Sequence, residues 1–166
     1  AKTMNKAEDS RYPDLSIVVT AYQWKWHYKY QDEGIEFYSS LARPSLDARR
    51  LDSGVDVNRV DNYLLDVDRP VVVPVGAKVR LLLTSNDVIH SWWVPDLGWK
   101  KDAIPGFVNE AWTQVDKPGV YRGQCAELCG RDHGFMPVVV EVVEADAYQA
   151  WVDTRKDGEA QLASAQ

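Results

Sequence analysis

Cysteine is scarce in this chain: Cys125 and Cys129 are the only two among 166 residues. A fold held together by disulfides needs more cysteines, distributed along the sequence. The chain must therefore be stabilised mainly by a hydrophobic core, and its length is sufficient for one domain with such a core. The clustering of both cysteines in one short window calls for a local chemical explanation.

Long apolar runs are also missing. The longest, such as Val71–Val75, have the length of a strand, whereas a membrane-spanning helix needs roughly 18 apolar residues. The first ten residues, AKTMNKAEDS, lack the apolar segment of a signal peptide. An excess of positive charge is absent too, because the net charge is −6, and this argues against nucleic acid as a partner. An acidic domain instead suits a basic protein partner that is steered electrostatically.

What the chain does contain is a series of short segments rich in β-branched and aromatic residues, separated by Pro and Gly turns. This pattern predicts an all-β Greek-key sandwich or barrel. The expected strands are Leu15–Trp26, Ile35–Tyr38, Tyr63–Val67, Val71–Val73, Lys78–Thr84, Val88–Val94, Ala111–Val115, Val120–Gln124 and Pro137–Val143. Residues 39–61 are expected to be irregular, and Glu144–Arg155 is the one helix candidate.

The domain organisation predicted from this pattern is simple. Residues 1–14 form a polar leader, residues 15–143 a single β domain, and residues 144–166 a short C-terminal helix with a tail. No repeat or linker interrupts the β domain.

Soft metal ligands are concentrated between the last two expected strands. Cys125, Cys129, His133 and Met136 lie within twelve residues there. Thiolate and thioether groups select copper over hard cations, and imidazole also suits copper. His90, on a separate expected strand, offers a second imidazole. A Cys–His–Met loop combined with a distant histidine is typical of copper sites that transfer electrons.

The second cysteine indicates two metal ions. A mononuclear blue copper site uses one thiolate, whereas two thiolates four positions apart can bridge two copper ions. Each ion would then keep one imidazole, from His90 or His133, and one weak ligand, either Met136 or a backbone carbonyl. The bridge would spread one electron over both metals, so bond lengths would change little on reduction. Such a site suits electron transfer and needs no open coordination position.

Other interpretations remain open on these residues alone. A Cys125–Cys129 disulfide in an oxidising compartment would leave His133 and Met136 unexplained. A zinc site with two cysteines and two histidines would exclude Met136, and the ligand spacing is not that of a zinc finger. The remaining histidine, His27, is expected to be a surface or packing residue.

Three stretches of the chain resemble cytochrome c oxidase subunit II, the subunit that carries the dinuclear copper A centre. They are Cys125–Pro137, Val88–Gly106 and Tyr22–Tyr28. The resemblance extends over residues 15–143 and implies a cupredoxin-like Greek-key β-barrel.

The resemblance also implies a role for each ligand. Cys125 and Cys129 would be the bridging thiolates, and His90 and His133 would each bind one copper ion. Met136 would be the weak ligand of one ion, and the backbone carbonyl of Glu127 that of the other. The Glu127 side chain would reach toward a magnesium ion at the junction with oxidase subunit I.

Several surface roles follow from the same resemblance. Trp24 would receive the electron from cytochrome c, and Asp87 would belong to the acidic surface on which cytochrome c docks. Asp32 and Glu33 are further candidates for that surface. Basic residues in the aromatic stretch stand where the family often has acidic or neutral ones, which limits the acidic surface on that side.

The implied function is transfer of single electrons from cytochrome c to haem in subunit I. The complete complex would be a proton-translocating oxidase of a respiratory chain, while the isolated domain would reduce no oxygen. Two membrane helices usually precede this domain in the family, so we expect a soluble piece of a membrane-anchored subunit. Its place would be the periplasmic face of a bacterial inner membrane.

The main alternative is the copper A domain of a nitrous oxide reductase, which shares the spacing Cys-x3-Cys-x3-His-x2-Met. The Trp92–Gly106 and Tyr22–Tyr28 stretches favour the oxidase. A copper chaperone or storage protein must release its metal, which fits poorly with ligands on two separate segments of a rigid barrel.

Overall fold

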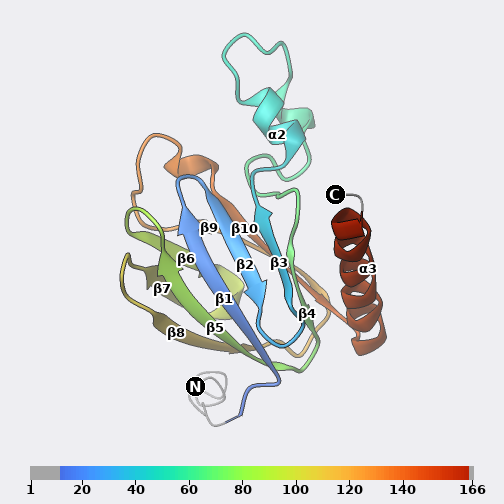
Figure 1. The fold of residues 1–166 in the computed structure, drawn as a ribbon. Helices are drawn as coiled ribbons and strands as arrows, with labels where there is room; N and C mark the ends of the chain where they lie inside the picture. The colour runs from blue at the N-terminus through green and yellow to red at the C-terminus, as the bar shows by residue number, and fades with distance from the viewer. Residues whose placement is uncertain (1–11, 165–166) are drawn as a thin grey trace.

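A computed structural model describes the backbone of residues 12–164 and side chains as far as residue 156. Most of the predicted leader, residues 1–11, and the last two residues of the tail lie outside this range. Within it, two five-stranded sheets form the body of the molecule (Figure 1). The all-β prediction is therefore confirmed.

The first sheet has the order β3-β2-β1-β5-β8 and the second the order β4-β10-β9-β6-β7. Neighbouring strands are antiparallel, except that β1 pairs with β5 and β10 with β4 in parallel. The strands of the first sheet are β1 (Leu15–Tyr22), β2 (Lys25–Tyr30), β3 (Ile35–Ser39), β5 (Lys78–Ser85) and β8 (Asn109–Gln114). Those of the second are β4 (Val71–Pro74), β6 (His90–Val94), β7 (Trp99–Ala103), β9 (Gly119–Cys125) and β10 (Pro137–Val143).

The core forms because alternate residues of a strand point to opposite faces of its sheet. In β5 every second side chain, at Val79, Leu81 and Leu83, is buried, while those between them remain half-exposed. The second sheet contributes Val138 and Val140 of β10 to the same cluster. The two inner faces thus share one core, which gives the ligand-bearing loop at its end a rigid base.

Two strand predictions in the N-terminal half were wrong. Leu15–Trp26 is not one strand, because a turn at Gln23–Trp24 separates β1 from β2 and pairs Tyr22 with Lys25. The aromatic composition runs through this turn unbroken and so conceals it. Tyr63–Val67 forms turns, since Asn62 and Leu64 have positive φ angles. Only Val67 makes an isolated bridge, to Leu41.

Further elements also differ from expectation. Residues 39–61 contain a helix, α2 (Arg43–Ala48), and a 3-10 turn, η1 (Val57–Arg59). The expected strand from Val88 begins only at His90. The charged strand β7 was not predicted because its sequence, WKKDA, lacks the apolar alternation of a half-buried strand. Two more 3-10 turns are η2 (Pro95–Leu97) and η3 (His133–Phe135).

The predicted C-terminal helix is present as α3 (Ala145–Ser164) and extends beyond its predicted end at Arg155. It lies beside β3 and β4 (Figure 1). The Trp151 ring packs at 5.1 Å from that of Tyr30, and Val152 is fully buried. Each helix in the described part of the chain is too short or too polar to be a membrane span.

Gly123 in β9 allows close contact with the neighbouring strand. A Cβ atom at this position would lie 1.8 Å from the carbonyl oxygen of Trp93, which is a backbone atom of β6 and cannot rotate away. We expect Gly123→Ala to destabilise the metal-free domain by about 3 kcal/mol, measured by denaturant unfolding. Gly134→Ala is the matched control, because a Cβ atom added at Gly134 would have no neighbour within 4 Å. Equal unfolding midpoints for the two variants would contradict this account.

Candidate metal centre

The ligand-bearing loop, residues 126–136, is closed at its base by the sheet. Pro137 pairs with Gln124 across β9 and β10, and the Cys125 N–H donates to the Met136 carbonyl at 2.9 Å. The loop is also attached to β6, because Trp92 pairs with Cys125 and the Ala126 N–H donates to the Ser91 carbonyl. These pairings place His90, at the start of β6, beside Cys125.

The four strongest predicted ligands lie in an unbroken chain of contacts. His90 Nδ1 is 3.8 Å from Cys125 Sγ, the two sulfur atoms are 3.8 Å apart, and Cys129 Sγ is 3.6 Å from His133 Nδ1. Each thiol therefore has one imidazole beside it. The sulfur atoms are much farther apart than the roughly 2.05 Å of a disulfide, so the structure shows two thiols.

The two weaker predicted ligands belong to the same loop. Met136 is 1% exposed at the base of the loop. The carbonyl oxygen of Glu127 is 3.4 Å from Cys125 Sγ, while the Glu127 residue as a whole is exposed. The backbone oxygen thus faces the thiols, and the carboxylate belongs to the surface.

The two thiols of the metal-free site have unequal pKa values. Burial raises the pKa of Cys125, but His90 and the backbone of Ser91 outweigh it and lower that pKa to about 7. Burial, together with the neighbouring Cys125, raises the pKa of Cys129 to about 12. Near neutral pH the two thiols thus share one negative charge at most. A metal ion bound between them would supply the positive charge that keeps both thiols ionised near neutral pH.

Asp87 holds His90 in place from the side opposite Cys125. Its Oδ1 atom is 2.8 Å from His90 Nε2, and its other oxygen accepts from the Gln23 N–H at 2.7 Å. Burial raises the pKa of Asp87, but the hydrogen bonds from His90, Gln23 and Val88 outweigh it and lower that pKa. An outer partner of this kind fixes which ring nitrogen faces the metal, so His90 presents Nδ1 to the thiols. We expected Asp87 only as a docking residue, so this contact is new.

The turn between β1 and β2 covers the other cysteine. The carbonyl oxygen of Cys129 accepts from Gln23 Nε2 at 2.9 Å and from Trp24 Nε1 at 3.2 Å. The half-buried Trp24 ring therefore lies directly against the loop, with the guanidinium carbon of Arg131 at 5.5 Å from its centroid. Nothing in the sequence distinguished Gln23 as a residue of the site.

Asp32 and Glu33 lie far from this centre. They occupy the turn after β2, whose six residues extend about 20 Å from the Trp24 end. Glu33 there forms an ion pair with Lys156 at 3.1 Å. The structure therefore brings together Trp24 and Asp87 at the centre, and leaves Asp32 and Glu33 at the opposite end of the sheet.

The donor set fits copper. Ligand atoms of His90, Cys125 and Cys129 all lie within 4.8 Å of one another, and all three residues are buried. Two sulfur donors with imidazole nitrogens are soft and borderline ligands that copper prefers, whereas hard cations prefer oxygen.

Two facing β-sheets with such a centre at one end define a cupredoxin-like domain with a candidate copper site. The family of the periplasmic domain of cytochrome c oxidase subunit II matches residues 15–143. The chain belongs to this family.

Individual relatives support the same family assignment. The probable cytochrome c oxidase subunit 2 of Rickettsia bellii is 46% identical over 155 residues, which cover 93% of this chain and 54% of the relative. The chain thus spans about half the length of the curated relatives it matches. The relatives are named as oxidase subunits, which does not favour the nitrous oxide reductase alternative.

Solved structures show the same fold. The periplasmic domain of oxidase subunit II (CoxB) of Bradyrhizobium japonicum is 40% identical, with a TM-score of 0.77 over 89% of this chain and 96% of that one. A second structure is the mixed-disulfide intermediate of a CoxB domain with the thioredoxin-like TlpAs. It is 40% identical, with a TM-score of 0.72 over 91% of this chain and 96% of that one. The cupredoxin-like prediction is thereby confirmed.

Proposed function

We propose that this chain is the electron-accepting domain of a haem–copper cytochrome c oxidase, with two copper ions bound between the β9–β10 loop and β6. One observation carries the proposal: two thiols lie between two imidazoles, at successive separations of 3.8, 3.8 and 3.6 Å. A mononuclear site needs only one of these thiolates. This order, with the two thiols in the middle and one imidazole at each end, would give each of two metals its own imidazole and access to both sulfurs.

In this proposal Cys125 and Cys129 would hold both metals, while His90 and His133 would each hold one of them. Met136 and the Glu127 carbonyl would serve as the weak ligands. The bound copper pair would store one electron at a time. The chain contributes burial and a fixed geometry, since Cys125, Cys129, His90 and Met136 are all less than 5% exposed. Rigid, dry surroundings reduce the rearrangement that accompanies each change of charge.

The partners in this proposal are cytochrome c as donor and oxidase subunit I as acceptor. The exposed Glu127 carboxylate would face subunit I and help to hold a magnesium ion there. Within the whole complex the electrons would reduce oxygen at haem, coupled to proton translocation. The domain would lie at the periplasmic face of the bacterial inner membrane, anchored by the remainder of the subunit. The match to a family described as a periplasmic domain supports that location, and the relatives, about twice as long as the matched region, leave room for a further part of the subunit.

Cytochrome c would dock over Trp24, whose indole contacts the Cys129 carbonyl. Asp87 would contribute negative charge to that surface, with a side chain that is 27% exposed. Asp32 and Glu33 lie too far away to touch a donor centred on Trp24. Their proposed contribution is long-range attraction, which salt screens within about 10 Å.

Copper loading tests this proposal. With both cysteines kept as thiols, the domain should bind two copper ions per chain and become purple. Its EPR spectrum should be that of one electron shared by both nuclei. The physical reason is the pair of bridging sulfurs, which couple the metals. Metal analysis and EPR of the same sample measure the result. A blue protein with one copper per chain would contradict the dinuclear centre.

Oxidation of the cysteines should prevent copper binding. A Cys125–Cys129 disulfide forms with the loss of two electrons and two protons to an oxidant, and it leaves no thiolate for the metal. The mixed disulfide formed by the related CoxB domain supports a need for reduction. We expect the oxidised domain to bind almost no copper until a thiol reductant is added, as measured by metal analysis of desalted protein. Equal copper content before and after reduction would contradict this prediction.

A further inference from the structure

Arg49, in the segment between β3 and β4, contacts the metal loop. This segment, residues 40–68, is called the α2 excursion below. It rises at the end of the molecule where the β9–β10 loop lies (Figure 1). Arg49 directly follows α2, and its Nη2 atom is 2.8 Å from Asp132 Oδ1. The two side chains are only 22% and 19% exposed.

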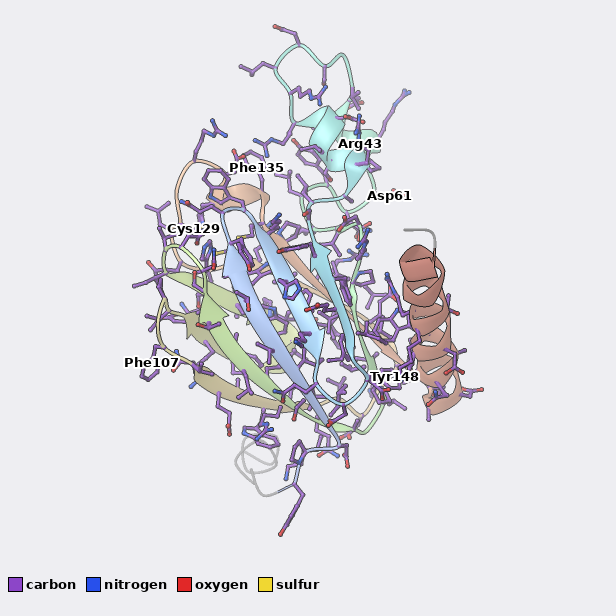
Figure 2. The ribbon with its side chains drawn as sticks, in the orientation of Figure 1. Arg43, Asp61, Phe107, Cys129, Phe135 and Tyr148 are labelled. Carbon is purple, nitrogen blue, oxygen red and sulfur yellow. The ribbon has the colours of Figure 1, made fainter. Side chains whose placement is uncertain are left out.

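The same guanidinium group makes a second contact with the loop. Its central carbon lies 3.6 Å from the centroid of the Phe135 ring, a stacking distance for a guanidinium on an aromatic face. Figure 2 shows Phe135 at the side of the loop near the α2 excursion. Asp132 and Phe135 enclose His133 in the sequence, and the Phe135 N–H donates to the Asp132 carbonyl at 2.9 Å. Arg49 therefore contacts Asp132, which directly precedes the 3-10 turn η3, and Phe135, its last residue, and so contacts the loop on both sides of His133.

Hydrogen bonds attach the α2 excursion to the sheet, and this attachment fixes the position of the Arg49 backbone. At its two ends, Ala42 and Ser40 pair with Asp66 and Asp68, respectively, through backbone hydrogen bonds of 3.0 Å. In its second half it is bound to β9. Arg122 contacts the Leu65 carbonyl and the Asp66 carboxylate, each at 2.7 Å, and Gln124 donates to the Leu64 carbonyl. Because β9 ends at Cys125, the same strand holds both the α2 excursion and the start of the metal loop.

We propose that Arg49 is a positioning residue of the copper centre, which fixes the His133 end of the loop and slows the loss of copper from it. The inference rests on the proposed function. His90 has its own outer partner in Asp87, and Arg49 supplies the corresponding restraint for the other imidazole through the backbone on either side of it. The α2 excursion, irregular in sequence, is thereby part of the metal site.

The test compares Arg49→Gln with Arg43→Gln in the copper-loaded domain. Arg43 is the matched control, since it begins α2, the helix that Arg49 follows, but its side chain is 75% exposed and pairs with Asp47. Removing an outer partner of a metal ligand typically costs about 10- to 100-fold in metal affinity. We expect Arg49→Gln to release copper to a chelator roughly tenfold faster than wild type, and Arg43→Gln to match wild type. The paramagnetically shifted NMR signals of His133 should move, and those of His90 should not.

Two further variants separate positioning from general stability. Arg49→Lys keeps the charge but loses the planar stack on Phe135, so it should restore part of the slow release. Asp132→Asn removes the ion pair but keeps the stack on Phe135, so it should release copper faster than wild type but no faster than Arg49→Gln. The double variant should release copper no faster than Arg49→Gln, because the Asp132 contact acts through Arg49. Release at the wild-type rate from Arg49→Gln, or equal movement of the His90 and His133 signals, would overturn the inference. A wild-type domain that binds no copper pair would instead overturn the proposed function.

Discussion

Replacing Cys129 with serine should abolish the dinuclear copper centre. The Cys129 sulfur lies between Cys125 and His133, at 3.8 and 3.6 Å from them. A serine hydroxyl does not ionise near neutral pH and is a harder ligand than a thiolate. Without Cys129 the two metals would have only the Cys125 sulfur in common, and the copper content should fall from two ions per chain to one at most. The EPR signal of one electron shared over both nuclei should disappear completely, and metal analysis with EPR checks both expectations.

Glu127→Gln is the control for that experiment. The Glu127 carbonyl lies 3.4 Å from Cys125 Sγ, whereas its exposed carboxylate is not needed for copper. This variant should therefore bind two copper ions with an unchanged EPR spectrum. A Cys129→Ser domain that still binds two ions and shares one electron between them would contradict the bridging role of this cysteine.

The proximity of the candidate ligands could be predicted because local sequence determines most of it. Cys125, Cys129 and His133 belong to one short loop whose two ends are adjacent strands, so any closed loop brings them near one another. His90 required one long-range assumption, that its strand lies beside the loop, and the Trp92–Cys125 pairing meets it. The strand pattern of β5 and β10 was equally clear, since their apolar alternation or apolar run is strong.

The contacts around the ligands could not be predicted in the same way. Asp87, Gln23 and Arg49 reach the centre through turns, and the partners of Gln23 and Arg49 lie 106 and 83 positions away along the chain. Polar side chains in turns carry no periodic signal, and their direction depends on backbone angles that composition does not reveal. The turn at Gln23–Trp24 is hidden for the same reason, within a stretch whose aromatic residues indicate a continuous strand.

Replacing Trp24 with phenylalanine should slow electron uptake from cytochrome c about tenfold, the equivalent of about 1.4 kcal/mol, and leave the copper spectrum intact. Trp24 is half-buried and donates from Nε1 to the Cys129 carbonyl, so it connects the surface to a proposed copper ligand. Phenylalanine has no N–H for this bond and a smaller ring to present to the donor. Tryptophans at the centre of an interface also contribute most to docking.

Stopped-flow mixing of reduced cytochrome c with the copper-loaded domain measures this effect. Trp93→Phe is the matched control, because Trp93 is 39% exposed on β6 and undergoes the same chemical change away from the Cys129 carbonyl. The control should react at the wild-type rate, and both variants should keep the wild-type copper spectrum. If Trp24→Phe accepts electrons as fast as Trp93→Phe, electrons reach the copper centre by another route, because the contact with Cys129 is then not needed for their uptake.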